Sequence, residues 1–228
     1  MFFAVNLPVV EYNWMYGVQL KTVERVREGV YNGVLFLLEH EPVFTIGKRG
    51  KRDNILVPET LLRSEGIEVV YTDRGGDITY HGPGQLVVYP ILDIVKFFGS
   101  VKRFVWTLEE VVIRLLRSYE IDAERKDGFP GVWLDDHRKI MSLGVAISRS
   151  GRRWISYHGI AFNVNTTMRH FSYINACGLG SSVIMVSMEQ VLGRKVDFDE
   201  VRDLYVKIFE ALLGIDLTTT DIRGLDLV

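Results

Sequence analysis

Several kinds of residue and motif are scarce in this chain, and each scarcity excludes a class of protein. The 228 residues include one cysteine, Cys177, so neither an internal disulfide nor a cysteine-rich zinc site can form. The 27 basic and 29 acidic side chains nearly balance, which argues against bulk-charge binding to nucleic acid or an anionic membrane. The longest apolar run, Leu86–Leu92, is far shorter than the roughly 20 residues that span a bilayer.

Targeting, nucleotide and metal signatures are also missing. The first ten residues contain no basic segment, so we predict no signal peptide and expect a cytoplasmic protein. Neither G-x-x-x-x-G-K-[ST] nor G-x-G-x-x-G occurs, which leaves P-loop hydrolysis and Rossmann dinucleotide binding unsupported. The five histidines lack close metal-ligand spacing, and no G-x-S-x-G nucleophile elbow occurs. We therefore predict neither a metal nor another cofactor.

Hydrophobic periodicity predicts a few helices among many strands. Helical spacing runs through Tyr16–Val30, Val101–Leu115 and Val201–Leu212, and a shorter helix with capping-box spacing is expected from Ser187. The strand-like runs are Phe2–Asn6, Gly33–Glu39, Val43–Gly47, Ile67–Thr72, Gln85–Leu92, Gly131–Leu134, Lys139–Ser148 and Trp154–Val164. Most strands follow one another without an intervening helix. This order predicts an α/β fold of the α+β type, one domain over residues 1–228 with helices packed on a mixed β-sheet.

The segment from Arg74 to Gln85 is the first that can carry chemistry. Its four glycines and one proline let the backbone turn tightly and approach a ligand closely. Glycine-rich turns are also common as plain surface hairpins, so composition alone leaves both interpretations open.

Two strand-like segments hold a lysine and a histidine with catalytic potential. Strand alternation places Lys139 on one face with Met141, Leu143, Val145 and Ile147. Desolvation beside that apolar row would lower the pKa of the lysine and make it a usable base, although a lysine at a strand end can also reach water.

The same alternation places His158 with Ser156 and Ile160, where a histidine can be catalytic or merely structural. Cys177 precedes a flexible Gly-x-Gly and is either a small buried hydrophobe or a nucleophile that needs a histidine or lysine to ionise it. The basic run Lys48–Arg52 is either a solvated loop or a docking site for an acidic partner.

Taken together, the segments resemble the lipoyl(octanoyl) transferase family, from about residue 30 to residue 192. The matching pieces, in chain order, are Leu38–Thr45, Arg74–Gly76 with His81–Gln85, Pro130–Trp133, Lys139–Ile140 with Leu143–Val145, Tyr157–Val164, and Ala176–Gly178. Each piece alone is weak, but all six in this order make a specific match.

This resemblance implies the fold of biotin and lipoate protein ligases and transfer of an octanoyl group, without ATP, from octanoyl-acyl carrier protein to a lysine of lipoyl domains. The acceptors implied are the lipoyl domains of 2-oxoacid dehydrogenases and the glycine cleavage H protein, in the first step of protein lipoylation. Cys177 matches the acyl-thioester nucleophile, and Lys139 matches the lysine that lowers its pKa. The substrate-binding residues implied are Arg74, Gly75, Gly76, Asp77, Ile78, Thr79, Tyr80, His81, Ser142, Leu143, Gly144, His158, Gly159, Ile160 and Ala161.

Three other functions stay open on the sequence. An ATP-dependent lipoate-protein ligase of the same fold would not need Cys177. An inactive carrier-protein-binding module would use the basic run Lys48–Arg52 for docking only. A hydrolase pairing Cys177 with His158 would release free octanoate when no acceptor is present.

Overall fold

The structure is a computed structural model that describes residues 1–175 and 183–227. Its helices are α1 (Tyr12–Glu28), α2 (Glu59–Ser64), α3 (Ile94–Phe98), α4 (Val101–Ser118), α5 (Met188–Leu192) and α6 (Phe198–Leu213), with 3-10 helices at Arg52–Asn54, Met168–Tyr173 and Ile222–Leu225. Its strands are β1 (Phe2–Val10), β2 (Gly33–His40), β3 (Val43–Ile46), β4 (Glu68–Tyr71), β5 (Ile78–His81), β6 (Gln85–Leu92), β7 (Glu124–Lys126), β8 (Phe129–Trp133), β9 (Arg138–Ser150), β10 (Arg153–Asn163), β11 (Ile184–Met185) and β12 (Leu217–Thr219).

Within the described residues the strands form two sheets. The larger has the order β12-β1-β2-β6-β10-β9-β8-β7, with β11 added beside β9, and the smaller has the order β4-β3-β5. In the larger sheet β1 is parallel to both its neighbours, whereas β2 through β7 pair antiparallel along the order. This arrangement confirms the mixed sheet expected from the chain order.

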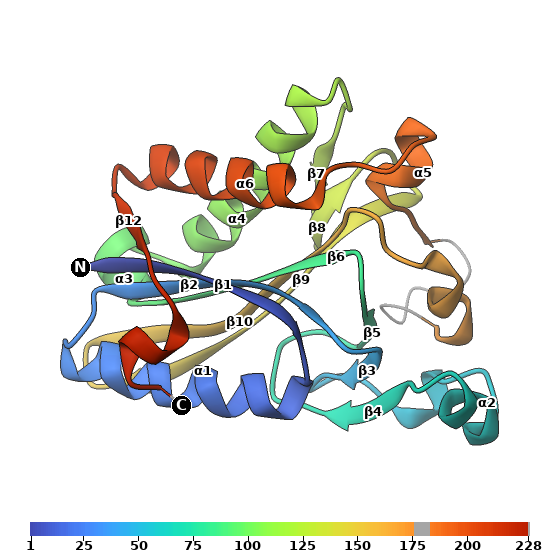
Figure 1. Ribbon diagram of the computed structural model, residues 1–228, viewed down its shortest axis with the longest axis horizontal. Helices are drawn as coiled ribbons and strands as arrows, with labels where there is room; N and C mark the ends of the chain where they lie inside the picture. Colours follow the sequence, from blue (N-terminus) through green and yellow to red (C-terminus); the bar gives the residue numbers. More distant parts are fainter. Residues whose placement is uncertain (176–182, 228) are drawn as a thin grey trace.

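Helices cover both faces of the larger sheet, with α4 and α6 on one side and α1 on the other (Figure 1). Strand alternation divides the core accordingly. Leu35 and Leu37 of β2 pack under α4 and α6, while Val34 and Phe36 face α1. Because both faces of β2 and β6 are buried, these strands are continuous apolar runs in the sequence.

The predicted helices all form, and their ends follow capping rules. α1 begins after Glu11, whose carboxylate accepts the backbone N–H groups of Asn13 and Trp14, and ends at Gly29 with φ of 84°. The predicted capping box between Ser187 and Gln190 is present at α5. The short elements α2, α3, β5, β7, β11 and β12 were not predicted, because segments of two to six residues carry too few periods to register.

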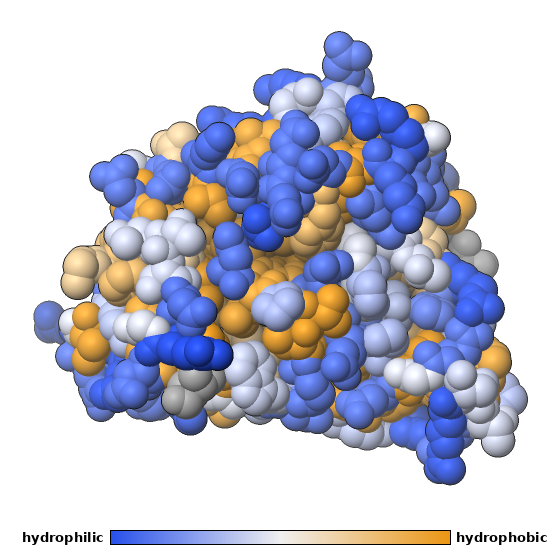
Figure 2. Space-filling model, viewed as in Figure 1, coloured by the Kyte–Doolittle hydropathy of each residue, from blue (hydrophilic) through white to orange (hydrophobic). Residues whose placement is uncertain are grey.

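The surface is mixed in character. Figure 2 shows apolar side chains reaching the surface in the middle of the viewed face, between hydrophilic groups above and below. Among the described residues, no helix is long and apolar enough to cross a membrane.

Candidate active site

A cavity with an empty volume of about 510 Å³ lies where the loop after β4 meets β9 and β10. We call it the inner cavity. Its walls come from helix α1, the loop and strand at 74–81, β6, β9 and β10. The lining residues are Tyr12, Arg74, Gly76, Asp77, Ile78, Thr79, His81, Tyr89, Lys139, Ser142, Leu143, Gly144, His158, Gly159, Ile160 and Ala161.

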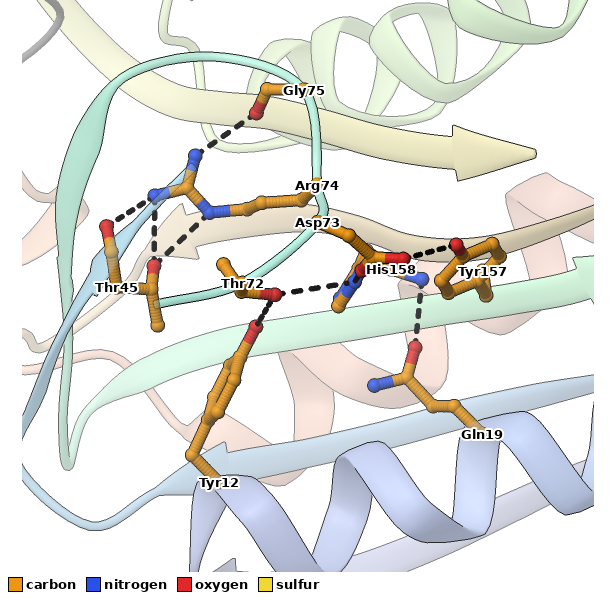
Figure 3. Close-up of polar contacts among 9 residues, drawn as sticks. All are labelled: Tyr12, Gln19, Thr45, Thr72, Asp73, Arg74, Gly75, Tyr157 and His158. Atoms are coloured by element: carbon orange, nitrogen blue, oxygen red, sulfur yellow. Dashed lines mark hydrogen bonds and ion pairs between the residues drawn. The ribbon is translucent and has the colours of Figure 1, made fainter. Parts of the chain in front are cut away.

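Arg74 fixes the loop that forms one wall of this cavity. Its Nε and Nη2 donate to Thr45 Oγ1 on β3 at 3.0 and 2.8 Å, and its Nη1 donates to the Gly75 carbonyl at 2.9 Å (Figure 3). The Gly75 N–H then donates to the Val145 carbonyl at 3.0 Å, which lays the loop on β9. A Cβ atom on Gly144 would lie 2.8 Å from the Gly75 carbonyl oxygen, so this close approach requires glycine in β9.

His158 anchors the same loop from β10. Its Nε2 lies 2.9 Å from Asp73 Oδ1, and Tyr157 donates its hydroxyl to the other oxygen of that carboxylate (Figure 3). His158 has φ of 53°, and its ring stacks on Tyr16 of α1 at 5.4 Å. The positive φ breaks strand alternation, so the prediction that His158 shares a face with Ile160 is wrong: Ile160 packs in the core under α4 and α6.

The electrostatics of this pair favour a neutral imidazole beside a carboxylate. Burial lowers the pKa of His158, and the Asp73 carboxylate opposes that shift only in part. Partial burial of Asp73 disfavours its charged form. Hydrogen bonds from His158 and Tyr157 outweigh this effect and lower the pKa of Asp73 to about 2. His158 therefore donates from Nε2, and its buried Nδ1 has no hydrogen-bond partner among the described residues.

Two further buried histidines lie together here: His81 is part of the cavity lining, and the His40 ring packs against it. His81 Nδ1 lies 2.8 Å from Gln85 Oε1, and Gln85 Nε2 donates to Asn163 Oδ1 at 3.0 Å. His40 lies between Val10 and Tyr89, with Nε2 2.8 Å from the Tyr89 hydroxyl. Burial lowers the pKa of His40 to about 4 and that of His81 well below its ordinary value, so both are neutral near pH 7.

Lys139 lines the cavity and is buried, with 5% of its surface exposed. Its Nζ donates to the Pro130 carbonyl at 2.8 Å and lies 5.0 Å from the centre of the Trp133 ring. Gly131, which follows Pro130 in the chain, donates its N–H to Glu109 Oε1 on α4 at 2.9 Å. Glu109 thus fixes the β8 segment against which the lysine is held.

The chain is similar to proteins of known function. Residues 11–210 match the lipoyl protein ligase A/B catalytic domain. An octanoyltransferase of Thermoanaerobacter sp. (strain X514) is 45% identical over 213 residues, which is 93% of this chain and 90% of that protein. The chain belongs to the octanoyltransferases. As an octanoyltransferase it is an acyltransferase enzyme, as the resemblance predicted.

Solved structures confirm the fold predicted for this octanoyltransferase. A lipoate-protein ligase A bound with ATP has a TM-score of 0.73 at 19% identity, over 99% of this chain and 91% of that one. A biotin protein ligase from Aquifex aeolicus in complex with biotin and ATP has a TM-score of 0.54 at 18% identity, over 93% and 70% of the two chains. At these identities the similarity concerns the fold alone.

The structure gathers most of the predicted substrate-binding residues of the octanoyltransferase at the inner cavity. Gly75 is at its edge and lines an adjoining groove instead, and Tyr80 packs with Phe44 and Phe171 in the core of the small sheet. Sequence reasoning missed Tyr12 and Tyr89. Tyr89 lies inside the apolar run of β6, where periodicity could not separate a cavity residue from a core residue.

Cys177 lies outside the described residues, but the chain on either side of it is positioned. The Asn175 N–H donates to the Asn54 carbonyl at 2.7 Å, and Asn54 Nδ2 donates to Asp77 Oδ1 of the cavity loop at 2.8 Å. On the other side, the Val186 N–H donates to the Lys139 carbonyl at 3.0 Å. Residues 175 and 186 are therefore both tied to the walls of the inner cavity.

Within residues 1–175 and 183–227, no group of three or more histidine, cysteine, aspartate or glutamate side chains is placed to hold a metal ion.

Proposed function

We propose that this octanoyltransferase moves an octanoyl group from octanoyl-acyl carrier protein to the lysine of a lipoyl domain, through a thioester on Cys177. The observation that carries the proposal is the buried Lys139 amine in the lining of the inner cavity, whose walls anchor the chain on both sides of the Cys177 segment. Family membership supports the transferred group.

The proposed reaction needs one proton acceptor and one nucleophile. Lys139 takes the proton of the Cys177 thiol, and the resulting thiolate attacks the octanoyl thioester carbonyl. The bond to the carrier sulfur breaks, and the carrier thiol leaves with the proton from Lys139. The acceptor lysine amine then attacks the acyl-enzyme and gives one proton to Lys139 as the amide bond forms, and the Cys177 sulfur leaves as a thiolate. Backbone N–H groups near Gly76 are candidates to stabilise the tetrahedral oxyanions.

The inner cavity suits an aliphatic tail. Gly144, Gly159 and Ala161 leave space in its wall, and Leu143 and Ile160 give it an apolar lining. At roughly 0.8 kcal/mol for each buried CH₂ group, an eight-carbon tail supplies several kcal/mol of binding. Most of the Arg74 guanidinium is committed to Thr45 and Gly75, which suits the positioning of a loop.

The partners follow from this chemistry. Thioester donors react downhill with amines, so the proposed reaction requires neither ATP nor another cofactor. The proposed acceptors are the lipoyl domains of 2-oxoacid dehydrogenases and of the glycine cleavage H protein. We further propose that residues 1–228 act as one catalytic domain.

Intact mass spectrometry tests the proposal directly. The protein is mixed with octanoyl-acyl carrier protein, without ATP and without acceptor. We expect a hydroxylamine-sensitive gain of one octanoyl group that is absent in Cys177→Ser and strongly slowed in Lys139→Met. An octanoylated lipoyl domain formed only when free octanoate and ATP are supplied would instead identify an ATP-dependent ligase. Rapid octanoate release without acceptor would identify a hydrolase.

A further inference from the structure

A second and wider hollow adjoins the inner cavity on the side of β8. It has an empty volume of about 1260 Å³, and we call it the outer groove. Its lining includes the apolar side chains of Val105 on α4 and Phe129 and Pro130 on β8, together with Arg49. Lys139, Leu143 and Val145 of β9 line it as well.

The two hollows meet at Lys139. Both are lined by Gly76, Lys139 and Gly144, together with Asp77 and Leu143. A linear ligand that occupies both hollows must therefore pass Lys139 at their junction. A thioester substrate has this shape, because its acyl tail and its thiol arm extend from opposite sides of the reacting carbonyl. If the tail fills the inner cavity, the arm leaves through the outer groove.

The arginine of the outer groove, Arg49, lies in a basic segment that is held in place. The Arg49 N–H donates to the Gly76 carbonyl at 3.0 Å, and the Lys48 N–H donates to the Arg74 carbonyl at 3.1 Å, so these residues are fixed relative to the cavity loop. Arg52 forms an ion pair with Glu59. Among the described residues, no carboxylate forms an ion pair with Lys48, Arg49 or Lys51.

We propose that the outer groove binds the 4′-phosphopantetheine arm of the acyl donor, with its phosphate at Arg49. This inference rests on the proposed function and identifies the part of the donor, outside the acyl chain, that the enzyme binds. The amide-containing arm runs over Val105, Phe129 and Pro130, and its anionic end meets the one arginine that lines the groove among the described residues. The charge of Arg49 favours this occupant over an acceptor lysine, because Arg49 attracts a phosphate and repels a cationic side chain.

Two donors that differ by one phosphate test the proposal. Octanoyl-4′-phosphopantetheine and octanoyl-pantetheine are compared by the rate of acyl-enzyme formation, measured as kcat/KM. We expect the native protein to prefer the phosphorylated donor about tenfold, as one charge-assisted contact at a partly exposed site allows. In Arg49→Gln this ratio should fall to about one.

A matched charge change serves as the control. Arg63 lies on α2 with its side chain 79% exposed and does not line the groove. Arg63→Gln should keep the native ratio, which separates a local contact from the loss of one positive charge anywhere on the surface. A native ratio near one, or an unchanged ratio in Arg49→Gln, would overturn the proposal.

The outcome also separates this inference from the proposed function. If neither donor forms an acyl-enzyme, while octanoyl-acyl carrier protein also fails, the proposed function itself is wrong. If both donors react equally and Arg49→Gln instead raises KM for the lipoyl-domain acceptor, the proposed transferase function is retained, but the outer groove binds the acceptor and not the donor arm.

Discussion

The buried histidine behind the inner cavity makes acid stability a quantitative test of the structure. His40 is fully buried, with Nδ1 3.0 Å from the Val10 carbonyl and Nε2 2.8 Å from the Tyr89 hydroxyl. A neutral ring satisfies both contacts, because Nδ1–H donates to Val10 and Nε2 accepts from Tyr89. Burial lowers the pKa of His40 from 6.5 to about 4, while the Val10 hydrogen bond opposes that shift.

The sign of the pH effect follows from the lowered pKa. Between pH 6.5 and 4 the unfolded chain binds a proton at His40 and the folded protein does not, so stability is complete above pH 6.5 and falls as the pH drops. Each pH unit in this window costs about 1.4 kcal/mol, so His40 accounts for a loss of about 2 kcal/mol between pH 8 and pH 5.

Urea unfolding of native protein and His40→Gln at both pH values measures this loss. Glutamine can contact Val10 and Tyr89 through its amide but does not titrate. From pH 8 to pH 5, we expect the decrease in the free energy of unfolding to be about 2 kcal/mol smaller in His40→Gln than in the native protein. The same pH 8 to pH 5 loss in both would refute the reasoning. If the variant does not fold, the ring titration of His40 in the native protein, followed by NMR, should show a midpoint near 4.

Three further predictions concern the walls of the cavity. Gly159→Ala places a Cβ against the Val88 carbonyl oxygen of β6, so chemical denaturation should show a loss of about 3 kcal/mol. Asn54→Ala removes the hydrogen bond that ties the cavity loop to the chain before residue 175, so KM for the acyl donor should rise more than kcat falls in steady-state kinetics. Asp73→Asn removes the carboxylate that keeps the pKa of His158 from falling further, so the His158 midpoint measured by NMR should move to lower pH, and an unchanged midpoint would contradict the pairing.

Local patterns were sufficient for the long elements and insufficient for the site. The apolar runs of β2 and β6 predicted buried strands, because a strand covered on both faces leaves no polar positions. β5 was hidden among the glycines of Arg74–Gln85, since four residues hold too little alternation to detect. Tyr12 and Tyr89 entered the cavity wall from segments that carry no motif.

What the sequence by itself determined was the long helices and strands, the mixed sheet and the family, because periodicity and six ordered motifs are local properties of the chain. What only the tertiary structure decided was which groups meet. His158 turned toward α1 because Asp73, Tyr157 and Gln19 hold it at a positive φ, against the alternation of its own strand. Lys139 reached the junction of two hollows because β8 and the loop at 74–77 both pack against β9. Such meetings depend on contacts between residues up to 139 positions apart in the chain, which no local pattern encodes.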